Sequence, residues 1–200
     1  MAIILASQSP RRRELLGQMG ITGFEIRPAR GEELPHPELS PARLVEELSR
    51  QKAAEVSADT DPGDLVIAAD TVVAADGGVL GKPGSPEEAA EMLSLLSGRS
   101  HVVYTGVTVV RDGEAVTEHE ATSVHFRSLT QDEIAAYVAT GEPMDKAGAY
   151  GIQGYGALLV EGIQGDYANV VGLPVCRLGR ILSRFGVDAL ALCAQKEQAT

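Results

Sequence analysis

Three consecutive arginines, Arg11, Arg12 and Arg13, follow the stretch LASQSP near the start of the chain. Ser9 is a typical N-cap residue and Pro10 suits the first position of a helix, so the stretch predicts a helix that begins at Pro10. The arginines then occupy the first turn, where the positive end of the helix dipole makes each exposed cation unfavourable by roughly 0.3–1 kcal/mol. Serine hydroxyls, free backbone amides and guanidinium groups together can bind phosphate. We therefore predict an anion site here, in preference to a basic turn that only faces solvent.

Two more charged residues follow apolar positions. Lys52 lies four residues after Leu48, on the same face of a helix predicted from Ser40 to about Val56. It can reach into a cleft or extend past the apolar face into water. Asp70 follows the apolar run Leu65–Ala69, which is typical of a strand covered on both faces. Ligands of open α/β sheets gather near the carboxyl ends of strands, so Asp70 is a candidate base or metal ligand; a turn-capping aspartate is the alternative.

The remaining polar residues favour metal-assisted attack of water on a polyphosphate. Glu32 and Glu33 stand in a proline-rich loop and either face solvent or supply a carboxylate to a hard cation such as Mg2+. Lys82 lies in a GKP turn that lacks the Walker A pattern. The four histidines have no zinc-ligand spacing, and no GxSxG or Cys-His motif provides a nucleophile.

The overall composition limits the classes of partner and compartment. A net charge of −11 and a pI near 4.8 argue against nonspecific binding to nucleic acid. No apolar run approaches the roughly 20 residues that span a bilayer, so no membrane partner is expected. The stretch MAIILAS lacks the charged lead of a signal peptide, and the two cysteines, Cys176 and Cys193, do not suggest a disulfide framework. We expect a cytoplasmic protein with a single domain over residues 1–200.

Strand and helix patterns alternate along the chain, and hairpin signals interrupt them. This order predicts an α/β fold with a mixed central sheet and flanking helices, not a purely parallel sheet. Residues 24–40 are expected to form a loop or edge strand. Hairpin turns are predicted at Asp76–Gly78 and Asp112–Gly113, and helix starts at Ser85 and Thr130. A glycine-rich tract covers residues 148–172, and closing helices are predicted from Leu173 onward.

Several motifs occur in the order seen in the Maf family, which this chain resembles from Ile3 to about Phe185. They are LASQSPRRRELL, AADTVV, GKP, LSGRSHVVYTGV and DKAGAYGIQG. The resemblance implies an elongated, two-lobed molecule with a cleft, similar to the inosine-triphosphate pyrophosphatase fold. It also implies hydrolysis of nucleoside triphosphates to the monophosphate and pyrophosphate, with a divalent cation, Mg2+ or Mn2+.

The resemblance assigns roles to the same charged residues. Asp70 is implied as the general base, and Glu33 with Asp70 as the residues nearest the metal. Arg13 has weaker support, because its angle on the helix differs from that of Arg12 by one residue step. The implied triphosphate-binding residues are Ser7, Ser9, Arg11, Arg12, Lys52 and Lys82.

Within the family, the tract DKAGAYGIQG at 145–154 resembles the branch that prefers dTTP and UTP. Arg12, Thr71 and Gln153 are implied to set this preference, and an amide such as that of Gln153 can offer a donor and an acceptor to a pyrimidine edge. The alternatives are a 7-methyl-GTP pyrophosphatase, or a nucleotide-sensing regulator of cell division and septum formation. A homodimer is expected from the resemblance.

Overall fold

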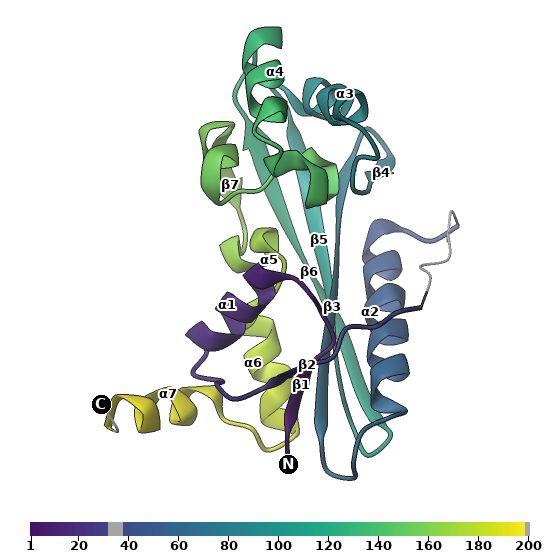
Figure 1. Cartoon of the computed structure of the whole chain (residues 1–200), viewed down its shortest axis with the longest axis vertical. Helices are drawn as coiled ribbons and strands as arrows, with labels where there is room; N and C mark the ends of the chain where they lie inside the picture. The colour runs from purple at the N-terminus through teal and green to yellow at the C-terminus, as the bar shows by residue number, and fades with distance from the viewer. Residues whose placement is uncertain (32–37, 199–200) are drawn as a thin grey trace. The chain divides into compact units, whose positions relative to one another are not determined.

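Seven strands form one mixed sheet with flanking helices in a computed structural model that describes residues 1–31 and 38–198 (Figure 1). The strand order is β2-β1-β3-β5-β6-β7, and β4 pairs with β3. Strand β1 pairs in parallel with β2 and β3, whereas β3 with β4 and β6 with β7 are antiparallel. The predicted α/β class with a mixed sheet is therefore confirmed.

The strands and helices have the following bounds. The strands are β1 (Ile3–Leu5), β2 (Glu25–Ile26), β3 (Leu65–Ala75), β4 (Gly78–Leu80), β5 (Ser100–Arg111), β6 (Glu114–Phe126) and β7 (Val160–Gln164). The α-helices are α1 (Pro10–Gln18), α2 (Pro41–Ser57), α3 (Pro86–Leu96), α4 (Gln131–Ala139), α5 (Tyr167–Val171), α6 (Val175–Arg184) and α7 (Ala189–Gln198). The described residues also form three 3-10 helices, η1 (Glu142–Asp145), η2 (Ala147–Ala149) and η3 (Gly154–Leu158).

The chain divides into two compact units. Unit 1 comprises Met1–Asp70, Thr105–Glu120 and Gly172–Thr200, and unit 2 comprises Thr71–Tyr104 and Ala121–Val171. Strands β3, β5 and β6 contribute residues to both units. The single domain expected over residues 1–200 stays a prediction.

The predicted helix starts are confirmed by their caps. In each case the hydroxyl of the N-cap residue accepts a hydrogen bond from the backbone N–H three residues later; the caps are Ser9, Ser40, Ser85 and Thr130. Thr130 and Glu133 form a complete capping box. At Ser85 the box is only half formed, because the Glu88 carboxylate accepts its hydrogen bond from Gly84 N, at 2.6 Å, rather than from Ser85 N.

Both predicted hairpin turns are present and have the backbone that their residues favour. Asp76 and Gly77 connect β3 to β4 with φ of 47° and 79°, and Asp112 and Gly113 connect β5 to β6 with φ of 49° and 81°. Positive φ at both central residues is the requirement of the tight hairpin turn. The expected edge strand is β2, while residues 32–37 of the proline-rich stretch lie outside the described residues.

One expectation about Asp70 is wrong: it does not stand where β3 ends. The strand continues to Ala75, because Thr71, Val72 and Val73 are β-favouring residues that keep the chain extended. Strand β1 pairs with β3 through Ile67, and β4 pairs with it from Val73 onward. Asp70 therefore lies inside β3, in the stretch between these two pairings.

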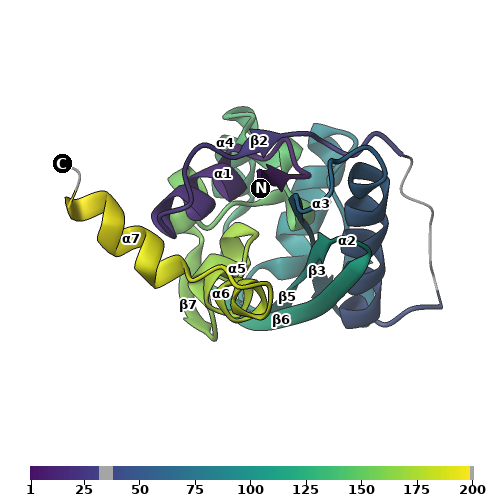
Figure 2. The same cartoon turned by 90° about the horizontal axis from the view of Figure 1, so that it is seen from below.

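In unit 1, helices α2 and α6 lie on either side of the strands (Figure 2). A close approach brings α2 onto β5, where a Cβ added to Gly106 would overlap the Val45 carbonyl and lie 2.8 Å from Glu46 N. The buried hydroxyls of Ser49 and Thr108 share a hydrogen bond of 2.9 Å across the same contact. A separate apolar cluster buries α2 against β1 and β3; its members are Ile4, Ala6, Ala53, Val56, Val66, Ala68 and Val110.

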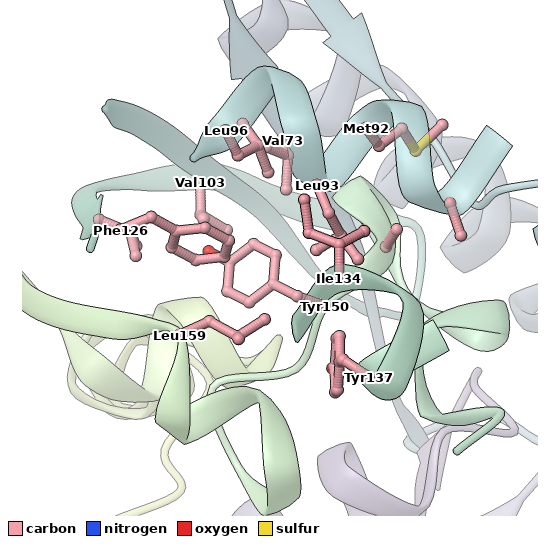
Figure 3. Packing of buried hydrophobic residues seen from close by; sticks show 13 residues of the cluster. Val73, Met92, Leu93, Leu96, Val103, Phe126, Ile134, Tyr137, Tyr150 and Leu159 are labelled. Atoms are coloured by element: carbon pink, nitrogen blue, oxygen red, sulfur yellow. The ribbon is translucent and has the colours of Figure 1, made fainter. Parts of the chain in front are cut away.

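Unit 2 has its own core, built around aromatic rings that pack edge to face (Figure 3). Phe126 and Tyr150 meet edge to face with ring centroids 4.7 Å apart. The His101 ring packs against both, and its Nε2 lies 2.7 Å from Tyr150 Oη. Burial, together with the charge of His125, lowers the pKa of His101 to about 4. His101 is therefore a neutral core residue at physiological pH.

We expect the stability of the protein to fall between pH 7 and 5 because of His101. The unfolded chain takes up this proton near pH 6.5, whereas the folded protein resists it until about pH 4. The stabilisation is therefore fully present above pH 6.5 and falls by about 2 kcal/mol on going to pH 5. Urea unfolding of His101→Gln should lack this part of the pH dependence. The comparison variant His125→Gln, at a half-exposed position, should retain most of it, because burial is the larger cause of the lowered His101 pKa. Equal pH dependence in wild type and His101→Gln would contradict the prediction.

Candidate functional site

The anion site predicted at the start of α1 has an ordered geometry. Ser7 lies two residues after Leu5, where β1 ends, and is buried, with only 7% of its surface exposed. Its Oγ accepts hydrogen bonds from Ser9 N and from Arg12 Nη1, each at 3.2 Å. The Arg12 Nε donates to the Gly172 carbonyl at 2.8 Å. The guanidinium is thus held in place beside the serine hydroxyl.

The three arginines differ in their surroundings. Arg11 and Arg12 are half-buried in the first turn of α1, whereas Arg13 is exposed. No acidic residue occupies that first turn to offset their charge. The arginines therefore lie at the positive end of the helix dipole, as predicted from the sequence.

Lys52 and Asp70 form an ion pair in unit 1. The Lys52 Nζ lies 2.5 Å from Asp70 Oδ1, and the two side chains are 20% and 10% exposed. Lys52 therefore does not extend past the apolar face of α2 into water, as one alternative allowed. Its position follows from the packing of α2, because Leu48 on the same face is buried.

The register of the sheet places the serine and the aspartate at one end of a strand pair. Leu5 pairs with Ile67 in parallel, and Ala6 N donates to the Ile67 carbonyl at 2.8 Å. Ser7 lies two residues after Leu5 and Asp70 three residues after Ile67, in the same direction. Unit 1 thus brings an arginine–serine anion site and a lysine–aspartate pair to the same end of β1.

The carboxylate of Asp70 suits a hard cation. Mg2+ is commonly bound by one or two carboxylates, with water and phosphate oxygens as its other ligands. Among the described residues, Oδ2 of Asp70 accepts no hydrogen bond, and no group of three or more His, Cys, Asp or Glu side chains forms a ready-made metal site. The other expected ligand, Glu33, lies outside the described residues.

The other residues named from the sequence belong to unit 2. Thr71 follows Asp70 directly and is half-buried. Lys82 is exposed in the turn after β4. That turn contacts the glycine-rich tract through a hydrogen bond of 2.9 Å from Gly148 N to the Gly81 carbonyl. Gln153 is half-buried.

Sequence reasoning missed the groups that hold these residues in place. Gly172 accepts from Arg12 across 160 positions of sequence, which no local pattern indicates. Tyr137 and Glu142 bind the backbone around Gln153. Gly106 had a usable signal, because a glycine inside a strand pattern often marks a close approach of another backbone.

A family model described as Maf-like protein matches residues 2–185. The chain belongs to the Maf family. The match covers the same region as the motifs in the sequence, and so confirms the resemblance drawn from them. No helix in the described part of this Maf-like protein is long and apolar enough to cross a membrane.

Several curated relatives of this Maf-like protein carry the same activity name. A dTTP/UTP pyrophosphatase from Moorella thermoacetica is 58% identical over 189 residues, covering 93% of this chain and 96% of the relative. A dTTP/UTP pyrophosphatase from Symbiobacterium thermophilum is 54% identical over 184 residues, covering 92% and 94%. Among solved structures, the chain is similar to a nucleoside-triphosphatase / dITP/XTP pyrophosphatase from Mycobacterium abscessus, with 18% identity, coverage of 92% and 97%, and a TM-score of 0.46. This last likeness is too distant to inform the chemistry.

Proposed function

We propose that this protein hydrolyses nucleoside triphosphates, with dTTP and UTP preferred, to the monophosphate and pyrophosphate, and so removes unwanted nucleotides from the pool. The observation that carries the proposal is the ion-paired Asp70 at the same end of β1 as the Ser7–Arg12 anion site. A buried carboxylate beside a phosphate-binding group can take a proton from water that attacks phosphorus. The relatives that are named dTTP/UTP pyrophosphatase support the choice of substrate.

In the proposed mechanism Asp70 is the general base. Lys52 holds the carboxylate through Oδ1, which leaves Oδ2 to accept the proton of the attacking water. Asp70 and Glu33 are the proposed metal ligands, and a bound Mg2+ or Mn2+ would supply charge neutralisation of the phosphate oxygens. Most of the rate enhancement would come from positioning and electrostatics, because the phosphoryl centre needs little covalent assistance.

The proposed triphosphate ligands share hydroxyl, ammonium or guanidinium groups. They are Ser7, Ser9, Arg11, Arg12, Lys52 and Lys82. Selection of the nucleobase is assigned to Arg12, Thr71 and Gln153. We also propose a cytoplasmic location, which agrees with free thiols at both cysteines, and a homodimer by analogy with the family.

Arg12→Lys is expected to raise KM for dTTP about 10-fold with a smaller change in kcat. The guanidinium donates to the Gly172 carbonyl through Nε and to Ser7 through Nη1, and a lysine cannot hold both contacts while presenting a fork to phosphate. Steady-state kinetics would measure the effect. The matched control is Arg13→Lys, an exposed neighbour in the same turn, which should stay within about twofold of wild type. Equal effects of the two substitutions would remove the assigned role of Arg12.

The decisive experiment is pyrophosphate release from dTTP, UTP, CTP, GTP and 7-methyl-GTP, each with Mg2+ and with chelator. Metal-dependent release from dTTP and UTP supports the proposal. Release mainly from 7-methyl-GTP would still support a nucleotide pyrophosphatase, but it would overturn the role in substrate preference that is assigned to Gln153. Tight nucleotide binding without pyrophosphate release from any of the five would overturn the proposal and favour a nucleotide-sensing regulator.

A further inference from the structure

The carboxylate of Glu142, at the start of η1, binds backbone amides that follow Gln153. Tyr155 N donates to Oε2 and Gly156 N to Oε1, both at 3.0 Å. Tyr137 Oη donates to the same Oε1 at 2.9 Å. Burial raises the pKa of Glu142, but these three hydrogen bonds and the charge of Lys146 together lower the pKa below its ordinary value. The carboxylate is therefore ionised at neutral pH and accepts hydrogen bonds through both oxygens.

The hydroxyl of Tyr137, on α4, binds the backbone that precedes Gln153. Gly151 N donates to Tyr137 Oη at 3.3 Å, while the hydroxyl hydrogen is given to Glu142. The Tyr137 side chain is buried in the core of unit 2, 5% exposed (Figure 3). One buried phenol therefore accepts from the amide of Gly151, before Gln153, and donates to the carboxylate that binds the amides after Gln153. Residues 151–156 are called the Gln153 segment below.

Two glycines make room for this pair. A Cβ on Gly154, where φ is +65°, would lie 2.6 Å from Glu142 Oε2. A Cβ on Gly156 would lie 2.8 Å from Tyr137 Oη. The segment around Gln153 therefore follows a path that only fits because these positions lack side chains.

We propose that Tyr137 and Glu142 are positioning residues for nucleobase recognition, because they hold the backbone on both sides of Gln153 and so determine where its amide is presented. The inference rests on the proposed function, in which Gln153 contacts the base. Neither side chain is assigned a contact with substrate. Their effect is transmitted through the backbone amides of residues 151, 155 and 156.

The test uses the near-isosteric variants Tyr137→Phe and Glu142→Gln, each alone and combined with Gln153→Ala. We expect each single variant to lower the ratio of kcat/KM for dTTP to kcat/KM for GTP about 10-fold, mainly through KM for dTTP. In the Gln153→Ala background the same substitutions should change that ratio no further, because a residue that acts through Gln153 has nothing left to position. Urea unfolding of each variant establishes that it is folded under assay conditions.

The matched control is Glu133→Gln on the same helix as Tyr137. Glu133 also binds a backbone amide, that of Thr130 at 2.8 Å, but it caps α4 and pairs with Arg127, both of which lie outside residues 151–156. It should lower stability and leave the dTTP-to-GTP ratio unchanged. Loss of activity in Tyr137→Phe that is equal for both substrates, or an effect additive with Gln153→Ala, would overturn the inference.

Failure of the proposed function has a different signature. A wild-type protein without dTTP turnover, or without preference for dTTP over GTP, would overturn the proposed function and this inference together. A wild type that prefers dTTP, with a preference that falls in Gln153→Ala but not in Tyr137→Phe or Glu142→Gln, would overturn the inference alone.

Discussion

Replacing Asp70 by asparagine is expected to reduce pyrophosphate release from dTTP by at least about 10²-fold while nucleotide binding is retained. The amide has the shape of the carboxylate and still offers Oδ1 to Lys52, 2.5 Å away in the wild-type protein, but it cannot accept the proton of the attacking water. The substitution also removes a negative charge, so the affinity for an anionic nucleotide should not fall. Turnover and equilibrium binding of dTTP to the variant would be measured side by side.

A titration with Mg2+ separates the two roles proposed for Asp70. If the residue acts mainly as a base, saturating Mg2+ leaves Asp70→Asn inactive. If it acts mainly as a metal ligand, high Mg2+ restores most of the turnover, and the base assignment is lost. The matched control is Asp76→Asn, six residues later. Asp76 is an exposed turn residue at φ 47°, a conformation that asparagine tolerates, so its turnover should equal that of wild type.

The second large effect is expected from Gly106→Ala, which should lower the free energy of unfolding by about 3 kcal/mol. The new methyl group would overlap the backbone of Val45 on α2, and a helix backbone cannot move aside as a flexible side chain can. Helix α2 would have to shift away from β5. Lys52 also lies on α2, seven residues after Val45. The shift should therefore also separate the Lys52 ammonium from Asp70 and lower kcat/KM for dTTP.

Urea unfolding and dTTP kinetics of the same preparation would measure both consequences. Gly162→Ala is the matched control: it is also a strand glycine, in β7, and a Cβ there meets nothing within 4 Å. Its unfolding free energy should stay within about 0.5 kcal/mol of wild type. A wild-type unfolding midpoint for Gly106→Ala would show that α2 and β5 do not pack as closely as described.

Much of the local structure could be predicted from short patterns. Ser9 with Pro10 and Ser40 with Pro41 start the helices they predict, because an N-cap bond reaches only three residues along the chain. Asp76–Gly77 and Asp112–Gly113 form the turns they indicate for an equally local reason. The end assigned to the strand before Asp70 was wrong, because a polar residue interrupts an apolar run without interrupting the backbone pairing that keeps a strand extended.

The sequence by itself determined the order of the helices and strands, the resemblance to the Maf family, and which charged residues stand at positions that local structure alone does not favour. The tertiary structure decided which of them meet: Lys52 with Asp70, Arg12 with Gly172, and Glu142 with the amides of Tyr155 and Gly156. Caps and turns depend on a few neighbouring backbone groups. The pairings depend instead on strand register and helix packing, which arise only when distant parts of the chain are buried together.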